Sequence, residues 1–369
     1  MMKKVKVGVI GCGNISDIYF ENLTKVFNNI VEVKACADLI TEKAEATKEK
    51  FNIPFIYTME QMLADPEIEI ILNLTTPHGH YEVCKQVLLA GKNVHVEKPL
   101  SIKKEEGKEL LALAKQKGLL IGCAPDTFMG AGIQTCRKLI DDGWIGKPIG
   151  ATAFMTCHGH ESWHPDPEFY YQIGGGPMFD MGPYYLTALV SLIGPVKSVS
   201  GMTAKSFDKR TITSEKKYGK EVEVEVPTHV AGLLNFENGA IGSMITSFDV
   251  WGAHLPFIEI YGTEGSLSVP DPNCFGGSVK VKRSNHGDFM EIPLTHIYGE
   301  NSRGIGLVDM AYSIRNNRVN RPCGDLGYHV LEIMHAFHES SDQGKQILME
   351  NKCERPAPLP QNLIRGYLD

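Results

Sequence analysis

The stretch VKVGVIGCGNIS, from Val5 to Ser16, decides how the first third of the chain is interpreted. Its first half is a β-branched run that predicts a buried strand, and apolar residues at helical spacing begin at Ile15. Gly11 allows a tight turn and Gly13 lets the backbone approach a pyrophosphate, whereas Ser16 stands where a third Gly or Ala is usual. The order strand, glycine turn, helix favours a dinucleotide-binding unit contacted at Gly11, Gly13, Asn14 and Ile15. The alternative is a plain strand-to-helix turn.

Strand and helix patterns alternate through the first third of the chain. Strands are expected at residues 31–37, 68–74, 93–96 and 119–124, and helices at 42–51, 81–90 and 103–117. Strands that alternate with helices of this length predict crossover units, and therefore a doubly wound parallel sheet of the Rossmann type. We assign residues 1–125 to this domain.

The pattern changes after about residue 125. A helix is expected at 132–141, strands at 149–157, 222–226, 230–236, 240–248, 257–261 and 266–269, an exposed loop near 200–220, and a last helix at 328–342. Asn238-Gly239 between two strand patterns predicts a hairpin. Residues 126–369 are therefore expected to form an α+β domain with a large, mostly antiparallel sheet.

Composition excludes several classes of protein. The 369 residues carry 37 Lys+Arg against 44 Asp+Glu, a net charge of −7, which argues against a nucleic-acid surface. No apolar run approaches the roughly 20 residues that cross a bilayer. The sequence Met1–Lys6 has the charge of a signal peptide, but the apolar stretch Val7–Ile10 is too short for one. Nine scattered cysteines without a C-x-x-C pair indicate reduced thiols in the cytoplasm.

Polar residues that could bind a ligand or take part in catalysis follow three of the predicted strands. Asp38 ends the second strand, where a carboxylate binds the ribose hydroxyls of NAD and repels the 2′-phosphate of NADP; a helix cap is the alternative. The next strand ends in Thr75-Thr76-Pro77 with His80, and another ends in Glu97-Lys98. Ligands of open α/β sheets collect at such carboxyl ends, so these residues are predicted to line the cofactor site.

Further pieces of the chain carry a resemblance to a known family. They are Gly11-x-Gly13, Asp38, Thr75-x-Pro77-x-x-His80, Ala90-Gly91-Lys92, Glu97-Lys98-Pro99, Asp180-Met181-Gly182-Pro183-Tyr184, Gly262-Thr263-Glu264-Gly265 and His329-Val330-Leu331-Glu332. In this order they resemble the glucose–fructose oxidoreductase and inositol dehydrogenase family (Gfo/Idh/MocA) over nearly the whole chain.

The resemblance implies an NAD(P)-dependent dehydrogenase acting on CH–OH groups of sugars, cyclitols or glycosides. It implies a second domain used for homodimer or homotetramer contacts, with Lys98 as the active-site lysine and Asp180 as its partner carboxylate. Most relatives have D-x-G-x-H, whereas this chain has Tyr184; the branch with glucose–fructose oxidoreductase and dihydrodiol dehydrogenase is similar in carrying D-x-G-x-Y.

A tyrosine can perform the base chemistry that alcohol oxidation needs. A free phenol, with a pKa near 10, is a poor base at neutral pH, and a nearby ammonium favours phenolate. Tyr184 is therefore predicted to accept the hydroxyl proton, Lys98 to activate it and stabilise the oxyanion, and Asp180 to orient Lys98 or a substrate hydroxyl. The alternatives are that Asp180 caps a helix in which Tyr184 merely packs, that Tyr185 is the reacting phenol, or that a loop histidine is the base.

The substrate side is predicted from the loop His158–His164 and from polar residues elsewhere. Trp163 could stack on a sugar face while His160 or His164 donates hydrogen bonds. The full predicted set is Asp126, His160, Trp163, His164, Tyr185 and Arg303. No metal is predicted, with a site built from His158, His160 and His164 as the alternative.

The resulting hypothesis is an NAD-dependent oxidoreductase for a secondary hydroxyl, with NADP less favoured and no nucleic-acid or membrane partner. Two alternatives remain: an NAD-using glycoside hydrolase or lyase that oxidises its substrate transiently, and a non-catalytic NAD sensor. Retention of Lys98 and Asp180 argues against the sensor.

Overall fold

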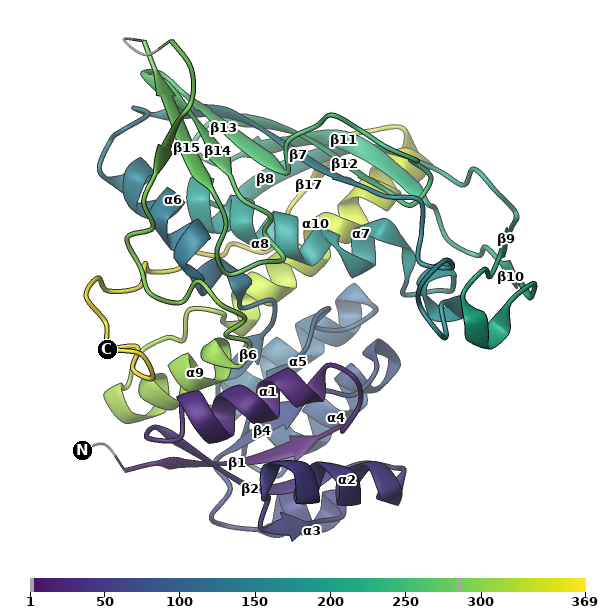
Figure 1. The fold of residues 1–369 in the computed structure, drawn as a ribbon, viewed down its shortest axis with the longest axis vertical. Helices are drawn as coiled ribbons and strands as arrows, with labels where there is room; N and C mark the ends of the chain where they lie inside the picture. The colour runs from purple at the N-terminus through teal and green to yellow at the C-terminus, as the bar shows by residue number, and fades with distance from the viewer. Residues whose placement is uncertain (1–2, 285–286) are drawn as a thin grey trace.

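The computed structural model describes residues 3–284 and 287–369, so Met1 and Met2, part of the segment considered as a leader, lie outside the described residues. Six parallel strands form the first sheet in the order β3-β2-β1-β4-β5-β6 (Figure 1). This is the strand order of a doubly wound dinucleotide-binding sheet, as predicted. The strands are β1 (Val5–Ile10), β2 (Val31–Ala37), β3 (Phe55–Ile56), β4 (Ile70–Asn73), β5 (Asn93–Val96) and β6 (Ile121–Cys123).

Helices cover this sheet, as its strongly buried strands require. The predicted strands at 31–37 and 93–96 match β2 and β5, and the predicted helices agree to within a few residues. The helices are α1 (Ser16–Glu21), which continues as the π-helical turn η1 (Asn22–Val26), α2 (Thr41–Phe51), α3 (Met59–Ala64), α4 (Pro77–Leu89) and α5 (Lys104–Lys117).

The second sheet has nine strands in the order β16-β15-β14-β13-β7-β12-β11-β8-β17. Every neighbouring pair is antiparallel except β7 and β12, so the sheet is mostly antiparallel, as predicted. Asn238 and Gly239 form the predicted hairpin between β11 and β12. The strands are β7 (Pro148–Thr156), β8 (Val196–Ala204), β11 (His229–Phe236), β12 (Ile241–Ser247), β13 (Ile258–Gly262), β14 (Gly265–Val269), β15 (Val279–Arg283), β16 (Met290–Ile292) and β17 (Ile347–Leu348).

One face of this sheet is covered by helices that lie between the two sheets (Figure 1). Two late helices also contact the first sheet: α9 touches β5 and β6, and α10 touches α5 and β6. The division of the chain at residue 125 stays a prediction. The helices of this part are η2 (Thr127–Met129), α6 (Ala131–Asp141), η3 (Glu168–Tyr171), α7 (Gly176–Asp180), α8 (Gly182–Ile193), η4 (Glu215–Lys217), α9 (Ile305–Asn316) and α10 (Gly324–Gln343).

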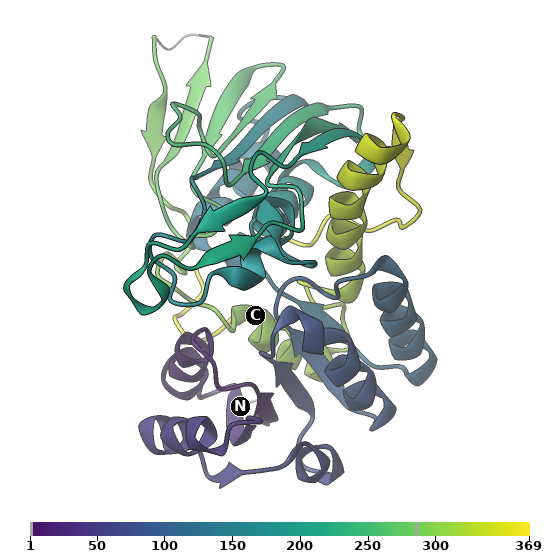
Figure 2. The same ribbon diagram turned by 90° about the vertical axis from the view of Figure 1, so that its right-hand side faces the viewer.

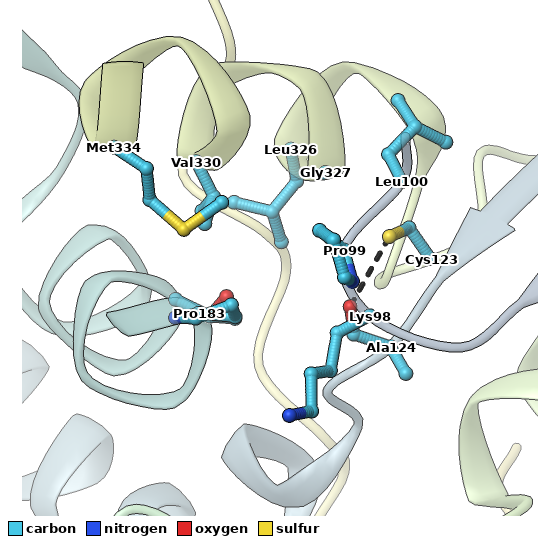
Figure 3. A pocket seen from close by; sticks show the side chains of 11 residues that line it. Lys98, Pro99, Leu100, Cys123, Ala124, Pro183, Leu326, Gly327, Val330 and Met334 are labelled. Atoms are coloured by element: carbon cyan, nitrogen blue, oxygen red, sulfur yellow. Dashed lines mark hydrogen bonds between the residues drawn. The ribbon is translucent and has the colours of Figure 1, made fainter. Parts of the chain in front are cut away.

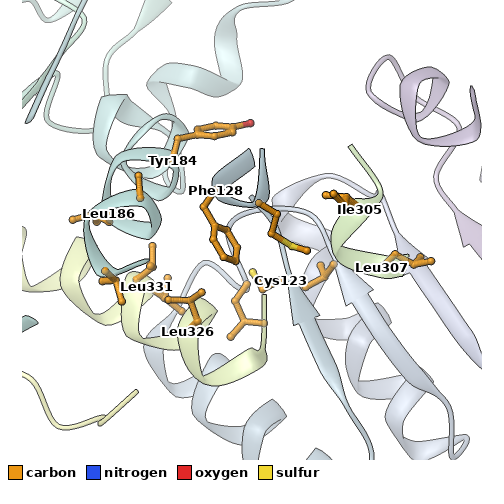
Figure 4. Close-up of a cluster of buried hydrophobic side chains, with 14 of the residues drawn as sticks. Cys123, Phe128, Tyr184, Leu186, Ile305, Leu307, Leu326 and Leu331 are labelled. Atoms are coloured by element: carbon orange, nitrogen blue, oxygen red, sulfur yellow. The ribbon is translucent and has the colours of Figure 1, made fainter. Parts of the chain in front are cut away.

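A shared apolar core joins the elements that carry the predicted catalytic residues. Figure 4 shows side chains from β6, α8, α9 and α10 packed together, among them Cys123, Leu186, Ile305 and Leu331. All four are at most 5% exposed. Because such interiors are close-packed, this core fixes α8 relative to the strand ends of the first sheet.

Residues 205–228, which we call the arm, project from the side of the second sheet. They form a two-stranded sheet of β9 (Lys209–Thr211) and β10 (Glu221–Glu223), on the right in Figure 1 and facing the viewer in Figure 2. The loop expected at 200–220 is therefore partly strand, since β8 extends to Ala204. Across the described parts of the chain, none of the helices has both the length and the apolar character to span a membrane.

Candidate active site

The glycine turn after β1 has the backbone and the open space that a pyrophosphate needs. Gly11 has φ +103°, and a Cβ there would lie 2.6 Å from the carbonyl oxygen of Leu74. A Cβ on Gly13 would meet nothing within 4 Å, so the space above the turn is free. Ser16 occupies the position of the third glycine, and it is buried. Its hydroxyl donates a hydrogen bond to the carbonyl oxygen of Gly13 at 2.7 Å. Asn14 and Ile15 lie exposed at this turn.

Asp38 lies beside the same turn, at the end of β2. Its Oδ2 accepts a hydrogen bond from the backbone N–H of Cys12, and its Oδ1 accepts one from Ile40, both at 2.8 Å. Helix α2 has Ile40 as its N-cap, so Asp38 itself is not the cap residue. The carboxylate is therefore held where the ribose of a dinucleotide would follow the pyrophosphate.

The predicted residues after β4 divide into two groups. Thr75, Thr76 and Pro77 lie at the strand's carboxyl end, where Pro77 opens α4. His80 is 1% exposed, with its ring nitrogens 2.6 Å and 3.0 Å from the carbonyl oxygens of Pro99 and Thr75. Burial lowers its pKa. His80 therefore ties two loops together and does not reach the cleft, because both nitrogens face backbone.

Glu97 and Lys98 take different roles at the end of β5. The carboxylate of Glu97 accepts hydrogen bonds from the Tyr19 hydroxyl (2.6 Å) and from the backbone N–H of Lys98 (2.9 Å). Tyr19 belongs to α1, and no motif identified it in the sequence. These bonds fix the backbone at Lys98. The side chain of Lys98 makes none of them and extends away from the first sheet.

Lys98 reaches across to Asp180 at the end of α7. Its Nζ donates to Oδ1 of Asp180 at 2.8 Å and to the Asp180 carbonyl at 2.7 Å. Burial opposes the charge of Lys98, but Asp180, with smaller contributions from Tyr184 and Glu97, outweighs burial, so the pKa of the ammonium is raised. Burial likewise opposes the carboxylate, yet Lys98 and His160 lower the pKa of Asp180 to about 2. An ammonium has three N–H donors, so one remains for another partner.

His160 lies on the other oxygen of Asp180. Its Nε2 is 3.2 Å from Oδ2, and its side chain is mostly buried. Burial disfavours the imidazolium, but the contacts with Asp180 and Cys157 together outweigh burial and raise the pKa of His160 to about 9. Asp180 therefore bridges two cations at neutral pH. Sequence reasoning placed His160 on the substrate side without detecting this contact.

Tyr184, on the first turn of α8, lies next to the same ammonium. Lys98 Nζ is 5.3 Å from the centroid of its ring, and its hydroxyl points away from the buried cluster in Figure 4. Burial raises the pKa of Tyr184, while the charges of Lys98 and Arg303 lower it, and the net direction is upward. The expected lowering toward neutral pH is thus not found, because burial outweighs the two cations.

Arg303 approaches Tyr184 from the segment before α9. Its guanidinium donates to the side-chain oxygens of Asn301 (2.9 Å) and Asn273 (2.7 Å). Burial lowers the pKa of Arg303, but Tyr184, together with Asp126 and Tyr19, outweighs this effect, and the net direction is upward. Arg303 is therefore placed beside the phenol by side chains that sequence reasoning did not identify.

Two of the other predicted substrate residues lie away from the cleft. Asp126 is 1% exposed, and its Oδ2 accepts the backbone N–H groups of Gly304 (2.8 Å) and Gly306 (3.1 Å). It thereby holds the start of α9, and burial raises its pKa to about 6. Tyr185 is 2% exposed and packs in the core.

The histidine-rich loop after β7 spreads its side chains over different partners. Trp163 is 62% exposed, and His164 Nδ1 accepts the backbone N–H of Asp166 at 3.1 Å. The ring of His158 stacks on Trp251, with centroids 3.4 Å apart. Within residues 3–284 and 287–369, no group of three His, Cys, Asp or Glu side chains is arranged to hold a metal ion.

A small apolar cavity lies behind Lys98 (Figure 3). Its volume is about 10 Å³, roughly one water molecule. In Figure 3 the ammonium of Lys98 points away from it. It is lined by Lys98, Pro99, Leu100, Cys123, Ala124, Pro183, Thr187, Leu326, Gly327, Val330 and Met334.

Solved structures share this architecture. A levoglucosan dehydrogenase in complex with NADH superposes with a TM-score of 0.80 at 22% identity, covering 95% of this chain and all of that one. An NAD binding oxidoreductase from Klebsiella pneumoniae gives a TM-score of 0.81 at 20% identity, covering 94% of this chain and 98% of the other. At these identities the likeness demonstrates the fold.

Curated relatives include both full-length and partial matches. A scyllo-inositol 2-dehydrogenase (NADP(+)) of Bacillus subtilis is 22% identical over 94% of this chain and 96% of its own length. A D-glucoside 3-dehydrogenase of Escherichia coli is 22% identical over 93% and 97%. Two uncharacterized oxidoreductases of Schizosaccharomyces pombe are 29% identical, and these alignments span only 57% of this chain and of each relative.

Two family models match consecutive parts of the chain. Residues 5–124 match the oxidoreductase family with an NAD-binding Rossmann fold, and residues 133–268 match the GFO/IDH/MocA C-terminal domain. The two matched segments therefore lead to the same assignment. The chain belongs to the GFO/IDH/MocA family of oxidoreductases and carries that family's NAD-binding Rossmann domain.

Proposed function

We propose that the protein is an NAD-dependent oxidoreductase that oxidises a secondary hydroxyl of a sugar, cyclitol or glycoside, or performs the reverse reduction. The observation that carries the proposal is the ammonium of Lys98, held on Asp180 beside Tyr184 at the carboxyl end of β5. Full-length relatives that act on an inositol and on a glucoside support the substrate class.

The cofactor is NAD, which accepts a hydride from carbon when it is bound. Gly11, Gly13, Asn14 and Ile15 hold its pyrophosphate, and Asp38 takes the ribose hydroxyls and disfavours the phosphate of NADP. Thr75, Thr76, Pro77, Glu97 and Lys98 line the nicotinamide side at the ends of β4 and β5. The open space at Gly13 and the fixed carboxylate of Asp38 fit this group.

The remaining residues move the proton and hold the substrate. The third N–H of Lys98 donates to the reacting oxygen and stabilises the negative charge that develops there. Tyr184 first loses its own proton to solvent and then accepts the hydroxyl proton as the phenolate, which the charges of Lys98 and Arg303 stabilise. His160 keeps Asp180 ionised and oriented, and Trp163 and His164 border the substrate.

The test is a panel of sugars, polyols and glycosides with NAD and with NADP, followed by NADH absorbance. The expected result is steady NADH formation with at least one member of the panel, and slower reaction with NADP. If the bound cofactor never exchanges and the glycoside is cleaved, the protein is instead a hydrolase or lyase that oxidises its substrate transiently. If NAD binds and no member of the panel is turned over, the remaining function is that of a non-catalytic NAD sensor.

The chain assembles as a homodimer or homotetramer through the outer face of the second sheet. Met202, Leu233 and Ile241 share that face by strand register and are 78%, 52% and 59% exposed. Self-association would remove this apolar surface from water. Sedimentation of the wild type and of Leu233→Glu tests it, with dissociation expected for the variant.

The nine free thiols fit a reducing cytoplasm.

A further inference from the structure

Beside the proposed site lies a set of aromatic side chains that we call the aromatic shelf: His160, Trp163, His164, Phe169 and Tyr170. The rings of Phe169 and Tyr170 have centroids 4.0 Å apart, and His164 lies 5.3 Å from Trp163 and 5.4 Å from Phe169. Trp163 and Phe169 are nevertheless 62% and 45% exposed. Exposed aromatic clusters of this kind typically mark binding surfaces.

The arm holds this shelf in one conformation. The Ser214 hydroxyl donates to the carbonyl of His164 at 2.7 Å, and the backbone N–H groups of Thr213 and Ser214 both donate to the carbonyl of Glu161 at 2.9 Å. Arg210, almost fully buried, lies 3.3 Å from the Glu161 carboxylate. A surface preorganised in this way loses little conformational entropy when a ligand binds.

Ion pairs add a second connection between the arm and the shelf. Lys216 and Lys217 pair with Asp166 at 2.7 Å and 2.8 Å, and Lys217 and Lys220 pair with Glu168. Exposed pairs are individually weak, but a network that shares carboxylates restrains the loop at two points. Both acidic residues lie between Trp163 and Phe169 in sequence, so the exposed rings flank the restrained segment.

His160 connects the shelf to the reacting centre. Its Nε2 lies 3.2 Å from Asp180, while its ring centroid is 5.3 Å from Trp163 and 4.0 Å from Tyr170. A sugar ring on Lys98 and Asp180 would therefore reach His160, and the aromatic surface begins one side chain farther out. A group attached to that sugar would lie against Trp163.

We infer that the aromatic shelf binds a second ring joined by a glycosidic bond to the sugar that is oxidised, so that two-ring glycosides are the preferred substrates. This inference rests on the proposed function. The apolar C–H face of a pyranose and the face of an aryl ring both bury area on an indole. A free monosaccharide would leave Trp163 and Phe169 exposed.

The experiment compares a methyl glycoside with the matching phenyl glycoside and disaccharide. In wild type we expect kcat/KM to be higher for both two-ring substrates. In Trp163→Ala the ratio of two-ring to one-ring kcat/KM should fall about tenfold or more, because the stacking area is lost. Trp144→Ala, which removes a partly exposed indole on the turn after α6, is the matched control and should keep the ratio. Phe169→Ala should lower it as well.

A binding measurement separates this inference from the proposed reaction. In Trp144→Phe/Trp251→Phe, Trp163 is the sole indole of the chain, and its fluorescence should change saturably with the phenyl glycoside and the disaccharide but not with the methyl glycoside. If no sugar is oxidised, the proposed function fails and this titration still decides the subsite. An unchanged ratio in Trp163→Ala, or equal fluorescence changes with one-ring and two-ring ligands, would overturn the shelf as a second-ring site.

Discussion

The ammonium of Lys98 lies 2.8 Å from the carboxylate of Asp180, although the two residues are 82 positions apart in the chain. Lys98 extends from the end of β5 in the first sheet, and Asp180 ends the short helix α7 beneath the second sheet. The contact therefore joins the two layers. Since Tyr184 and His160 both adjoin this pair, its removal should affect the chemistry of the site.

Replacing Lys98 by methionine is expected to lower kcat about 10²- to 10³-fold, the effect typical of losing a donor to a developing oxyanion. Methionine keeps much of the side-chain volume and removes the charge. Steady-state kinetics on the best substrate of the panel measures the effect, with thermal unfolding to verify the fold. Lys103→Met is the matched control, since Lys103 is 69% exposed and pairs only with Glu106 within the described chain. Wild-type kcat in Lys98→Met would remove Lys98 from the mechanism.

Replacing Tyr184 by phenylalanine should change the pH dependence of oxidation. Because the pKa of Tyr184 is raised above its usual value near 10, the phenolate fraction grows up to about tenfold per pH unit across the neutral and mildly alkaline range. The wild-type rate should therefore rise with pH, and Tyr184→Phe should lose this dependence and about 10²-fold or more in kcat. Tyr185→Phe, in the core, is the control. If the slope survives in Tyr184→Phe and disappears in His160→Asn, the histidine is the base.

Sequence periodicity predicted five of the six strands of the first sheet, because these strands are apolar and separated by turn residues. The remaining strand, β3, has two residues and is too short to show a period. Helix α9 was missed for a different reason: every residue from Ile305 to Ser313 is buried, so the helix has no polar face to reveal a period. Its one internal carboxylate, Asp309, is 0% exposed and pairs with Arg318 and Arg321. That pairing is tertiary and leaves no local pattern.

Site residues that belong to a sequence motif could be predicted. Residues whose position depends on tertiary packing were harder to predict. Lys98 and Asp180 follow from their motifs, and the structure brings them together. His80 and Asp126 also follow strand ends, but each is buried and bonded to backbone groups of neighbouring loops. Tyr19 supports Glu97 from a helix whose sequence gives no sign of that contact. Position at a strand end therefore predicts proximity to the cleft and not the direction of a side chain.

Replacing Asp38 by serine should change the choice of cofactor. The carboxylate is fixed by two backbone N–H groups beside the glycine turn, where it would repel a 2′-phosphate. Asp38→Ser keeps an acceptor and removes the charge, so kcat/KM for NADP relative to NAD should rise about tenfold or more, equivalent to at least about 1.4 kcal/mol. Asp17→Ser, which removes an exposed carboxylate paired with Lys50, should leave the ratio unchanged. An unchanged ratio in Asp38→Ser would place the ribose elsewhere.

The last prediction concerns stability in acid and rests on His95. This residue of β5 is 0% exposed, neither ring nitrogen has a hydrogen-bond partner among the described residues, and burial lowers its pKa to about 3. The unfolded chain takes up a proton near pH 6.5 that the folded chain refuses, so the free energy of unfolding must fall as the pH drops below that value. From pH ~6.5 to ~5 the loss from this group is about 2 kcal/mol.

Comparison with a variant isolates this effect from other groups. Asp126, whose pKa is raised to about 6, has the opposite sign, since it takes up its proton in the folded state first and favours folding in acid. Urea unfolding of wild type and of His95→Met at several pH values gives the difference due to His95. His95→Met should lose less stability in acid than wild type, whereas the exposed-residue control His78→Met should follow wild type. Parallel stability curves for wild type and His95→Met would mean that His95 takes up its proton at the same pH in the folded and the unfolded chain, and the apolar environment assigned to it would be wrong.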